Sequence, residues 1–149
     1  MEVLALLKNK ARRVCTIASS QTVEDAICLM AGQEVSALLV TENDQPAGIF
    51  SKEDLFKSLL GKKLAAVSKI KLEHAMTRNF FLAKSEDPIT TVLDKMIAAD
   101  ITYLPVVEDK EIIGILTLKD MMKYQIDALI DEIYQLKDYI ADLHEAGQD

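Results

Sequence analysis

Residues 36–60 read SALLVTENDQPAGIFSKEDLFKSLL, and residues 102–126 read TYLPVVEDKEIIGILTLKDMMKYQI. They belong to longer copies, residues 14–60 and 80–126, which align at an offset of 66 residues without insertion or deletion. A unit of this length that occurs twice predicts two half-domains with a shared core and a pseudo-two-fold cleft between them. The identities between the copies include Met30 with Met96, Leu38 with Leu104, Val40 with Val106, Gly48 with Gly114, Ile49 with Ile115, and Asp54 with Asp120.

Each copy has the same pattern of elements. Short apolar stretches at 14–17 and 80–83 predict strands, and apolar residues at helical spacing then predict an amphipathic helix. Thr22 suits the N-cap of the first helix, and Pro88 suits the first turn of the second. Two apolar runs follow, separated by the polar turns ENDQ and EDKE, and a second helix ends the copy. The order is therefore strand, helix, strand, strand, helix.

This pattern predicts an α+β or α/β fold, in which two tandem βαββα repeats pair as a pseudo-two-fold module and a long C-terminal helix follows. We place the first repeat at residues 1–66 and the second at 67–126. Residues 127–149 extend the last helix and are predicted to form a coiled coil.

Composition restricts the classes of function. The 149 residues carry 17 basic and 24 acidic side chains, and a net charge of -7 disfavours a nucleic-acid partner. No apolar run approaches the roughly 20 residues of a membrane span, so no membrane partner is expected. The two cysteines lack metal-ligand spacing, which predicts no metal site and favours a cytoplasmic location.

The stretches GIFSKED and GILTLKD carry the chemistry that points to a ligand. Each places a hydroxyl, Ser51 or Thr117, at the start of a helix and an aspartate, Asp54 or Asp120, three residues later. A helix N-terminus favours an anion, and a carboxylate can accept hydrogen bonds from both vicinal hydroxyls of a ribose. The same residues would also serve as ordinary helix caps, and the two roles are compatible.

The order of elements, together with VSALLV, ITYLPVV, GIFSKED, GILTLKD and HAMTRN, resembles the cystathionine β-synthase (CBS) domain over residues 3–126. Two such domains in tandem resemble a Bateman module. The resemblance implies a regulatory module that binds an adenosine-containing nucleotide, most plausibly AMP, with no other cofactor. It also implies crossed sites, in which the base contacts strands of one repeat and the ribose contacts the Ser/Thr and Asp of the other.

Carried over by position, the resemblance implies two sites. One joins Thr77, Phe81, Ile101 and Thr102 with Ile49, Ser51 and Asp54, and the other joins Cys15, Val35 and Ser36 with Ile115, Thr117 and Asp120. We expect the first to be the better site, because Ala11 occupies the place equivalent to Thr77 in the second.

The pattern departs from that of strong nucleotide binders in the family. No His or Arg stands in the strand after the first helix of either copy, so the cation for a phosphate would come from elsewhere. The candidates are Arg12, Arg13, Lys62, Lys63 and Arg78.

Nothing in the sequence supports catalysis. His74 and His144 stand apart, neither cysteine has a basic partner nearby, and no glycine-rich phosphate loop is present. We therefore predict that the chain is not an enzyme.

The C-terminal segment from Lys119 to His144 contains no Gly or Pro. Its apolar residues alternate at spacings of three and four, which predicts a parallel two-stranded coiled coil and hence a homodimer through this helix and the repeat faces. The alternative is a long helix packed on its own domain.

If the helices of two chains pair, a ligand could change the angle between them and so signal to a separate, unknown effector protein. The rival function is a ligand-free dimerisation scaffold. The six seam positions are Ile126, Leu129, Ile133, Leu136, Ile140 and Leu143.

Overall fold

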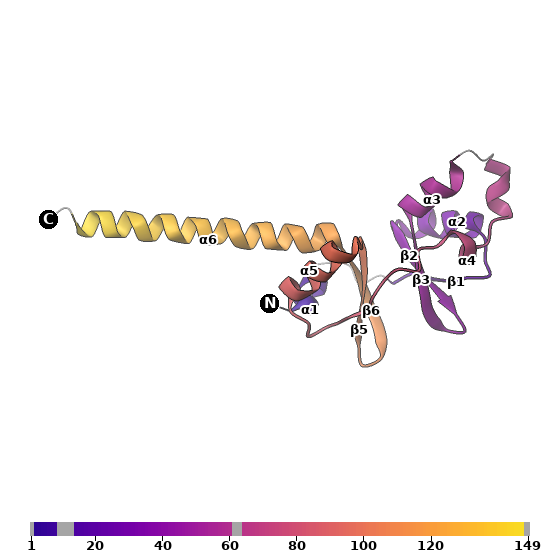
Figure 1. Cartoon of the computed structure of the whole chain (residues 1–149), viewed down its shortest axis with the longest axis horizontal. Helices are drawn as coiled ribbons and strands as arrows, with labels where there is room; N and C mark the ends of the chain where they lie inside the picture. The colour runs from indigo at the N-terminus through magenta and orange to yellow at the C-terminus, as the bar shows by residue number, and fades with distance from the viewer. Residues whose placement is uncertain (1, 9–13, 61–63, 148–149) are drawn as a thin grey trace.

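The computed structural model describes residues 2–8, 14–60 and 64–147. Within these ranges the chain forms two lobes followed by one long helix (Figure 1). In chain order the elements are α1 (Val3–Lys8), β1 (Thr16–Ala18), α2 (Val23–Gln33), β2 (Ala37–Glu42), β3 (Gln45–Ser51), α3 (Lys52–Leu59), the 3-10 helix η1 (Leu64–Ser68), α4 (Leu72–Ala75), β4 (Ala83–Lys84), α5 (Ile89–Ala99), β5 (Tyr103–Glu108), β6 (Glu111–Thr117) and α6 (Leu118–Ala146).

The two lobes contain matching three-stranded sheets, in the orders β1-β2-β3 and β4-β5-β6. In each sheet the first strand pairs in parallel with the second, which pairs antiparallel with the third. The hairpin loops are Asn43–Asp44 and Asp109–Lys110, and all four residues have positive φ. Two such residues in succession make the two-residue turn that matches the twist of a hairpin. The predicted order of elements and both hairpins are confirmed.

Side chains of the central strands point alternately to the two faces of each sheet, and each face contributes to a different apolar cluster. In β2, Leu38 and Val40 enter the core of the first lobe, whereas Leu39 faces the second lobe. In β5, Leu104 enters the core of its own lobe, whereas Tyr103 faces the first. Because successive side chains of a strand point to opposite faces, each strand contributes to its own lobe and to the junction.

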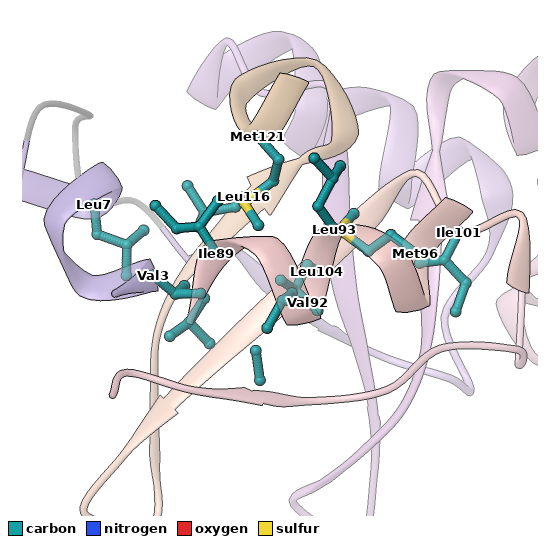
Figure 2. Close-up of a cluster of buried hydrophobic side chains, with 12 residues drawn as sticks. Val3, Leu7, Ile89, Val92, Leu93, Met96, Ile101, Leu104, Leu116 and Met121 are labelled. Carbon is teal, nitrogen blue, oxygen red and sulfur yellow. The ribbon is translucent and has the colours of Figure 1, made fainter. Parts of the chain in front are cut away.

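Each core is completed by a short helix that precedes the other repeat in the sequence. Figure 2 shows Val3 and Leu7 of α1 beside Ile89, Leu116 and other side chains of the second lobe. Leu72 of α4 is buried in the first lobe in the same way. The packing of α4 against the first lobe therefore crosses the predicted boundary between residues 66 and 67. The division of the chain into repeats at that boundary stays a prediction.

The shared glycines allow these helices to approach the third strand of each sheet. A Cβ on Gly48 would lie 2.8 Å from Met76 Sδ and 2.9 Å from the Thr77 carbonyl oxygen. A Cβ on Gly114 would lie 2.6 Å from Leu7 Cδ2. Both distances are too short for a side chain, which gives a physical reason why this identity recurs in the two copies.

Two local predictions need correction. The strands predicted at 14–17 and 80–83 form at Thr16–Ala18 and Ala83–Lys84, so the first is shifted and only the last residue of the second is included. Phe80 instead forms a tight turn, in which its N–H donates to Arg78 O. Pro88 is the residue before α5 and lies outside its first turn.

Helix α6 runs from Leu118 to Ala146 and continues past the second lobe (Figure 1). Its first turn is packed, since Met121 is fully buried. The six seam positions are all exposed, by 47% to 63%. The alternative in which this helix packs against its own domain is therefore wrong for the described residues of this chain.

Candidate functional site

The junction of the two lobes is an apolar cluster formed by facing sheets. Ala37, Leu39 and Ile49 of the first sheet are buried there together with Tyr103 of the second. Phe80, in the segment that connects the lobes, packs against their edge. Ala37 and Tyr103 occupy equivalent positions in the two copies, so the large side chain is present on one side only.

A cavity of about 330 Å³ opens beside this cluster on the side that contains Tyr103. Its walls come from the end of β3 and the start of α3, from the connecting segment, and from the entry to β5. The lining residues are Ile49, Ser51, Glu53, Asp54, Lys57, Thr77, Asn79, Phe80, Asp100, Ile101, Thr102 and Tyr103.

Asp54 is a buried carboxylate in the wall of this cavity, with 7% of its surface exposed. Its Oδ2 accepts hydrogen bonds from the Ser51 backbone N–H at 2.9 Å and from Ser51 Oγ at 3.0 Å. Its Oδ1 accepts from Thr77 Oγ1 at 2.7 Å. Because each carboxylate oxygen has two lone-pair sites, Oδ1 has room for one more donor.

The first hydrogen bonds of α3 explain how Asp54 reaches this position. The Asp54 N–H donates to Ser51 Oγ at 3.4 Å, which completes a reciprocal capping box. Thr117 and Asp120 form the same box at the start of α6, and Thr22 and Asp25 at the start of α2. The predicted capping roles of Thr22, Ser51 and Thr117 are confirmed.

The connecting segment is attached to β3 by two backbone hydrogen bonds. The Ile49 N–H donates to Thr77 O at 2.9 Å, and the Thr77 N–H donates to Ile49 O at 2.8 Å. This pairing brings the Thr77 hydroxyl to Asp54 and places Phe80 on the cavity wall.

Six of the seven residues predicted for the first site line this cavity: Ile49, Ser51, Asp54, Thr77, Ile101 and Thr102. The placement of Phe81 is the exception. Phe81 packs against the core of the second lobe, and its neighbour Phe80 lines the cavity. The role of these residues in binding a ligand stays a prediction.

Sequence reasoning missed the contact between Tyr103 and Glu53. Tyr103 Oη donates to Glu53 Oε2 at 3.0 Å and so joins the second sheet to the first turn of α3. Burial raises the pKa of Tyr103 to about 12, and the hydrogen bond to Glu53 and its charge act in the same direction. Burial also raises the pKa of Glu53, but hydrogen bonds from its own N–H, Ser51 and Tyr103 outweigh this and lower it below its usual value.

Replacing Tyr103 by Phe should lower the free energy of unfolding at pH 7 by about 1 kcal/mol, because one hydrogen bond to a carboxylate is lost. In the wild type the phenol keeps its proton in the folded state up to about pH 12, whereas the unfolded chain loses it near 10. Stability should therefore fall as pH rises from 10 to 12, and Tyr103→Phe should remove that part of the decline.

Urea unfolding at pH 7 and above pH 10 measures both effects. Tyr134→Phe is the control, because it removes a hydroxyl from the exposed part of α6. Equal pH profiles for wild type and Tyr103→Phe would contradict the assignment.

The residues of the second predicted site do not line this cavity. Ile115 packs against the junction cluster, and Cys15 and Val35 are partly buried against the first core. Ser36 is exposed, and its carbonyl oxygen accepts from the Lys52 N–H at 3.0 Å. Thr117 and Asp120 are joined by their capping box. This second site remains a prediction.

Ala11, the predicted equivalent of Thr77, lies outside the described residues, but the segments before the two copies can be compared through their backbone hydrogen bonds. The Leu72 N–H donates to Gln21 O, and the Val3 N–H donates to Asp87 O. The acceptors are 66 residues apart but the donors are 69 apart, so the helices before the two copies follow a different offset. Counted in that way, Lys8 is the counterpart of Thr77, at the end of α1.

Several predicted cations lie outside the described residues: Arg12, Arg13, Lys62 and Lys63. Arg78 is described, and its Nη2 lies 3.5 Å from Glu42 Oε1. Among the described residues no group of three His, Cys, Asp or Glu side chains could hold a metal ion. Within the same part of the chain, no helix has both the length and the apolar content to cross a bilayer.

The family model of the CBS domain matches residues 10–61 and 67–127. The chain therefore belongs to the CBS-domain family, as a tandem pair. A CBS-domain protein of Agrobacterium tumefaciens superposes with a TM-score of 0.72 at 25% identity, over 84% of this chain and 99% of that one.

Two other relatives indicate the range of the family. A CBS-domain pair solved with 5′-methylthioadenosine and S-adenosyl-L-methionine superposes with a TM-score of 0.68 at 24% identity, over 86% of this chain and 98% of that one. A homoserine O-acetyltransferase of Methanohalobium evestigatum is 30% identical over 112 residues, which are 74% of this chain. The chain spans only 22% of that protein's length.

Proposed function

We propose that this CBS pair is a regulatory module, not an enzyme, that binds an adenosine-containing nucleotide, foremost AMP, in the cavity between its repeats. The observation that carries the proposal is the position of Asp54. A buried carboxylate, held by three donors and with an acceptor site remaining, lines a cavity of about 330 Å³. Such a group can accept a hydrogen bond from one hydroxyl of a ribose.

The remaining walls suit the other parts of a nucleotide. Ile49, Phe80 and Ile101 offer apolar contacts to the faces of a base. Ser51 lies at the N-terminus of α3, where the helix dipole favours a phosphate. The proposal therefore assigns the base to the apolar walls, and the sugar and the phosphate to the first turns of α3.

We propose that the presence of a ligand in the cavity is transmitted to α6 through Thr102. Its side chain lines the cavity, and its carbonyl oxygen accepts from the N–H of Leu118, the first residue of α6, at 2.8 Å. A ligand that displaces the 101–103 segment would thereby displace the start of α6. If α6 pairs with a second copy through its exposed seam, occupancy would alter the geometry of a homodimer, and a separate effector protein would read it.

The rival function is a ligand-free scaffold, and the capping boxes favour it. The three hydrogen bonds of Asp54 to Ser51 and Thr77 are made within this chain, so the fold uses this residue whether or not a ligand binds. In the scaffold reading the exposed seam of α6 is the functional surface and the cavity has no occupant.

Thermal unfolding of protein confirmed to be ligand-free distinguishes the two functions. A ligand at 100 times its Kd that binds only the folded state adds about 2.7 kcal/mol, or several degrees of melting temperature for a chain of this size. We expect AMP to produce such a shift and GMP a smaller one. No shift at millimolar concentration with AMP, ADP, S-adenosylmethionine or NAD would support the scaffold.

A further inference from the structure

Among the described residues that line the cavity, Lys57 is the one cation. It lies on α3, one turn beyond Asp54, and therefore on the same face of the helix. Within the same part of the chain its ammonium group makes no ion pair, whereas Arg78 lies beside Glu42. Its charge is thus available to a ligand.

The other charges at the cavity are negative. Glu53, Asp54 and Asp100 line it, which gives three carboxylates to one ammonium group. Asp54 accepts three hydrogen bonds from Ser51 and Thr77, and Glu53 accepts one from Tyr103, so both carboxyl groups are held in place at the cavity. A ligand that enters therefore meets one localised positive charge, together with the N-terminus of α3.

We propose that Lys57 binds the 5′-phosphate of the ligand and thereby selects a nucleoside monophosphate over a diphosphate or triphosphate. The proposal rests on the proposed function, because it assigns a role within the same cavity. One phosphate is matched by Lys57 and the helix N-terminus. Each further phosphate adds negative charge that no other cation among the described lining residues matches, and it does so beside the side chains of Glu53, Asp54 and Asp100.

The second repeat supplies a matched control. Lys123 occupies the position equivalent to Lys57, three residues after Asp120. It does not line this cavity but lies beside an apolar groove at the start of α6. Lys57→Met and Lys123→Met remove the same charge and keep an unbranched side chain of similar length, so they differ only in whether the charge faces the cavity.

The experiment is calorimetric titration of adenosine, AMP, ADP and ATP into wild type and both variants, without divalent cations. We expect wild type to bind AMP about tenfold more tightly than adenosine, and more tightly than ADP or ATP. Lys57→Met should bring the affinity for AMP down to that for adenosine and leave adenosine within about twofold. Lys123→Met should change none of these ratios.

Two results would overturn the assignment of Lys57: an unchanged ratio of AMP to adenosine in Lys57→Met, or tighter binding of ATP than of AMP by wild type. Either result still requires adenosine compounds to bind, so it would leave the proposed function standing. Failure of every adenosine compound to bind would overturn both proposals.

Discussion

Ile133→Asp is expected to convert the protein from a dimer to a monomer at micromolar concentration. Ile133 is a central seam residue of α6, and 53% of its surface is exposed. Isoleucine at every a position and leucine at every d position favour a parallel pair of helices. Burying each such side chain against a partner contributes about 1.5–3 kcal/mol, and an aspartate there would reverse that contribution.

Charge along the same helix agrees with this pairing. Glu132 occupies a g position and Lys137 the following e position, so the two could pair between parallel chains. The three heptads of exposed seam are a large apolar surface on the part of α6 that extends past the second lobe.

Light scattering reports the mass of each variant. Ala141→Asp is the control, because it adds the same charge to the same helix outside the a and d positions. A chain that ends at Gln125 should lose association as Ile133→Asp does. Full association of both altered chains would show that the seam does not hold the dimer.

Asp54→Asn is expected to abolish tight nucleotide binding. The substitution keeps the shape of the side chain but removes its charge and replaces one acceptor oxygen by a donor. Each charged hydrogen bond lost to a ribose hydroxyl costs about 1.5–3 kcal/mol, a factor of roughly 10 to 150 in Kd. Asp54 also completes a buried capping box, so asparagine is a better choice than alanine, which would leave the Ser51 and Thr77 donors unsatisfied.

The sequence was sufficient for features that depend on local spacing. The apolar runs that include residues 37–40 and 103–106, each followed by a polar turn, predicted the strands, and the spacing of Ser51 and Asp54 predicted a cap that is present. Isoleucine and leucine occupy every a and d position of the stripe on α6, which is typical of a helix that pairs with another helix. These six positions are exposed in the structure, and pairing through them stays a prediction.

What could not be predicted depends on packing between the lobes. Phe80 and Phe81 are adjacent aromatic residues that face opposite sides, and their sequence does not say which one faces the cavity. The bond from Tyr103 to Glu53 joins residues 50 positions apart in different repeats. Its only signal was the difference between Ala37 and Tyr103 at equivalent positions of the two copies.

The positions of the helices before the two copies also could not be predicted from the repeat. The 66-residue offset holds within the copies, but the helices that complete the cores are related by 69 residues. An alignment of the copies cannot reveal this, because the contacts of α1 and α4 are made with sheets distant in sequence.

The central claim is that the cavity containing Asp54 binds AMP, and calorimetric titration of AMP into wild type, Asp54→Asn and Asp120→Asn tests it most directly. Asp120→Asn makes the same chemical change in the equivalent capping box of α6, away from this cavity. The account predicts that Asp54→Asn weakens the tighter AMP site by at least about tenfold, while Asp120→Asn leaves that site unchanged. Equal AMP affinity in wild type and a folded Asp54→Asn would contradict it.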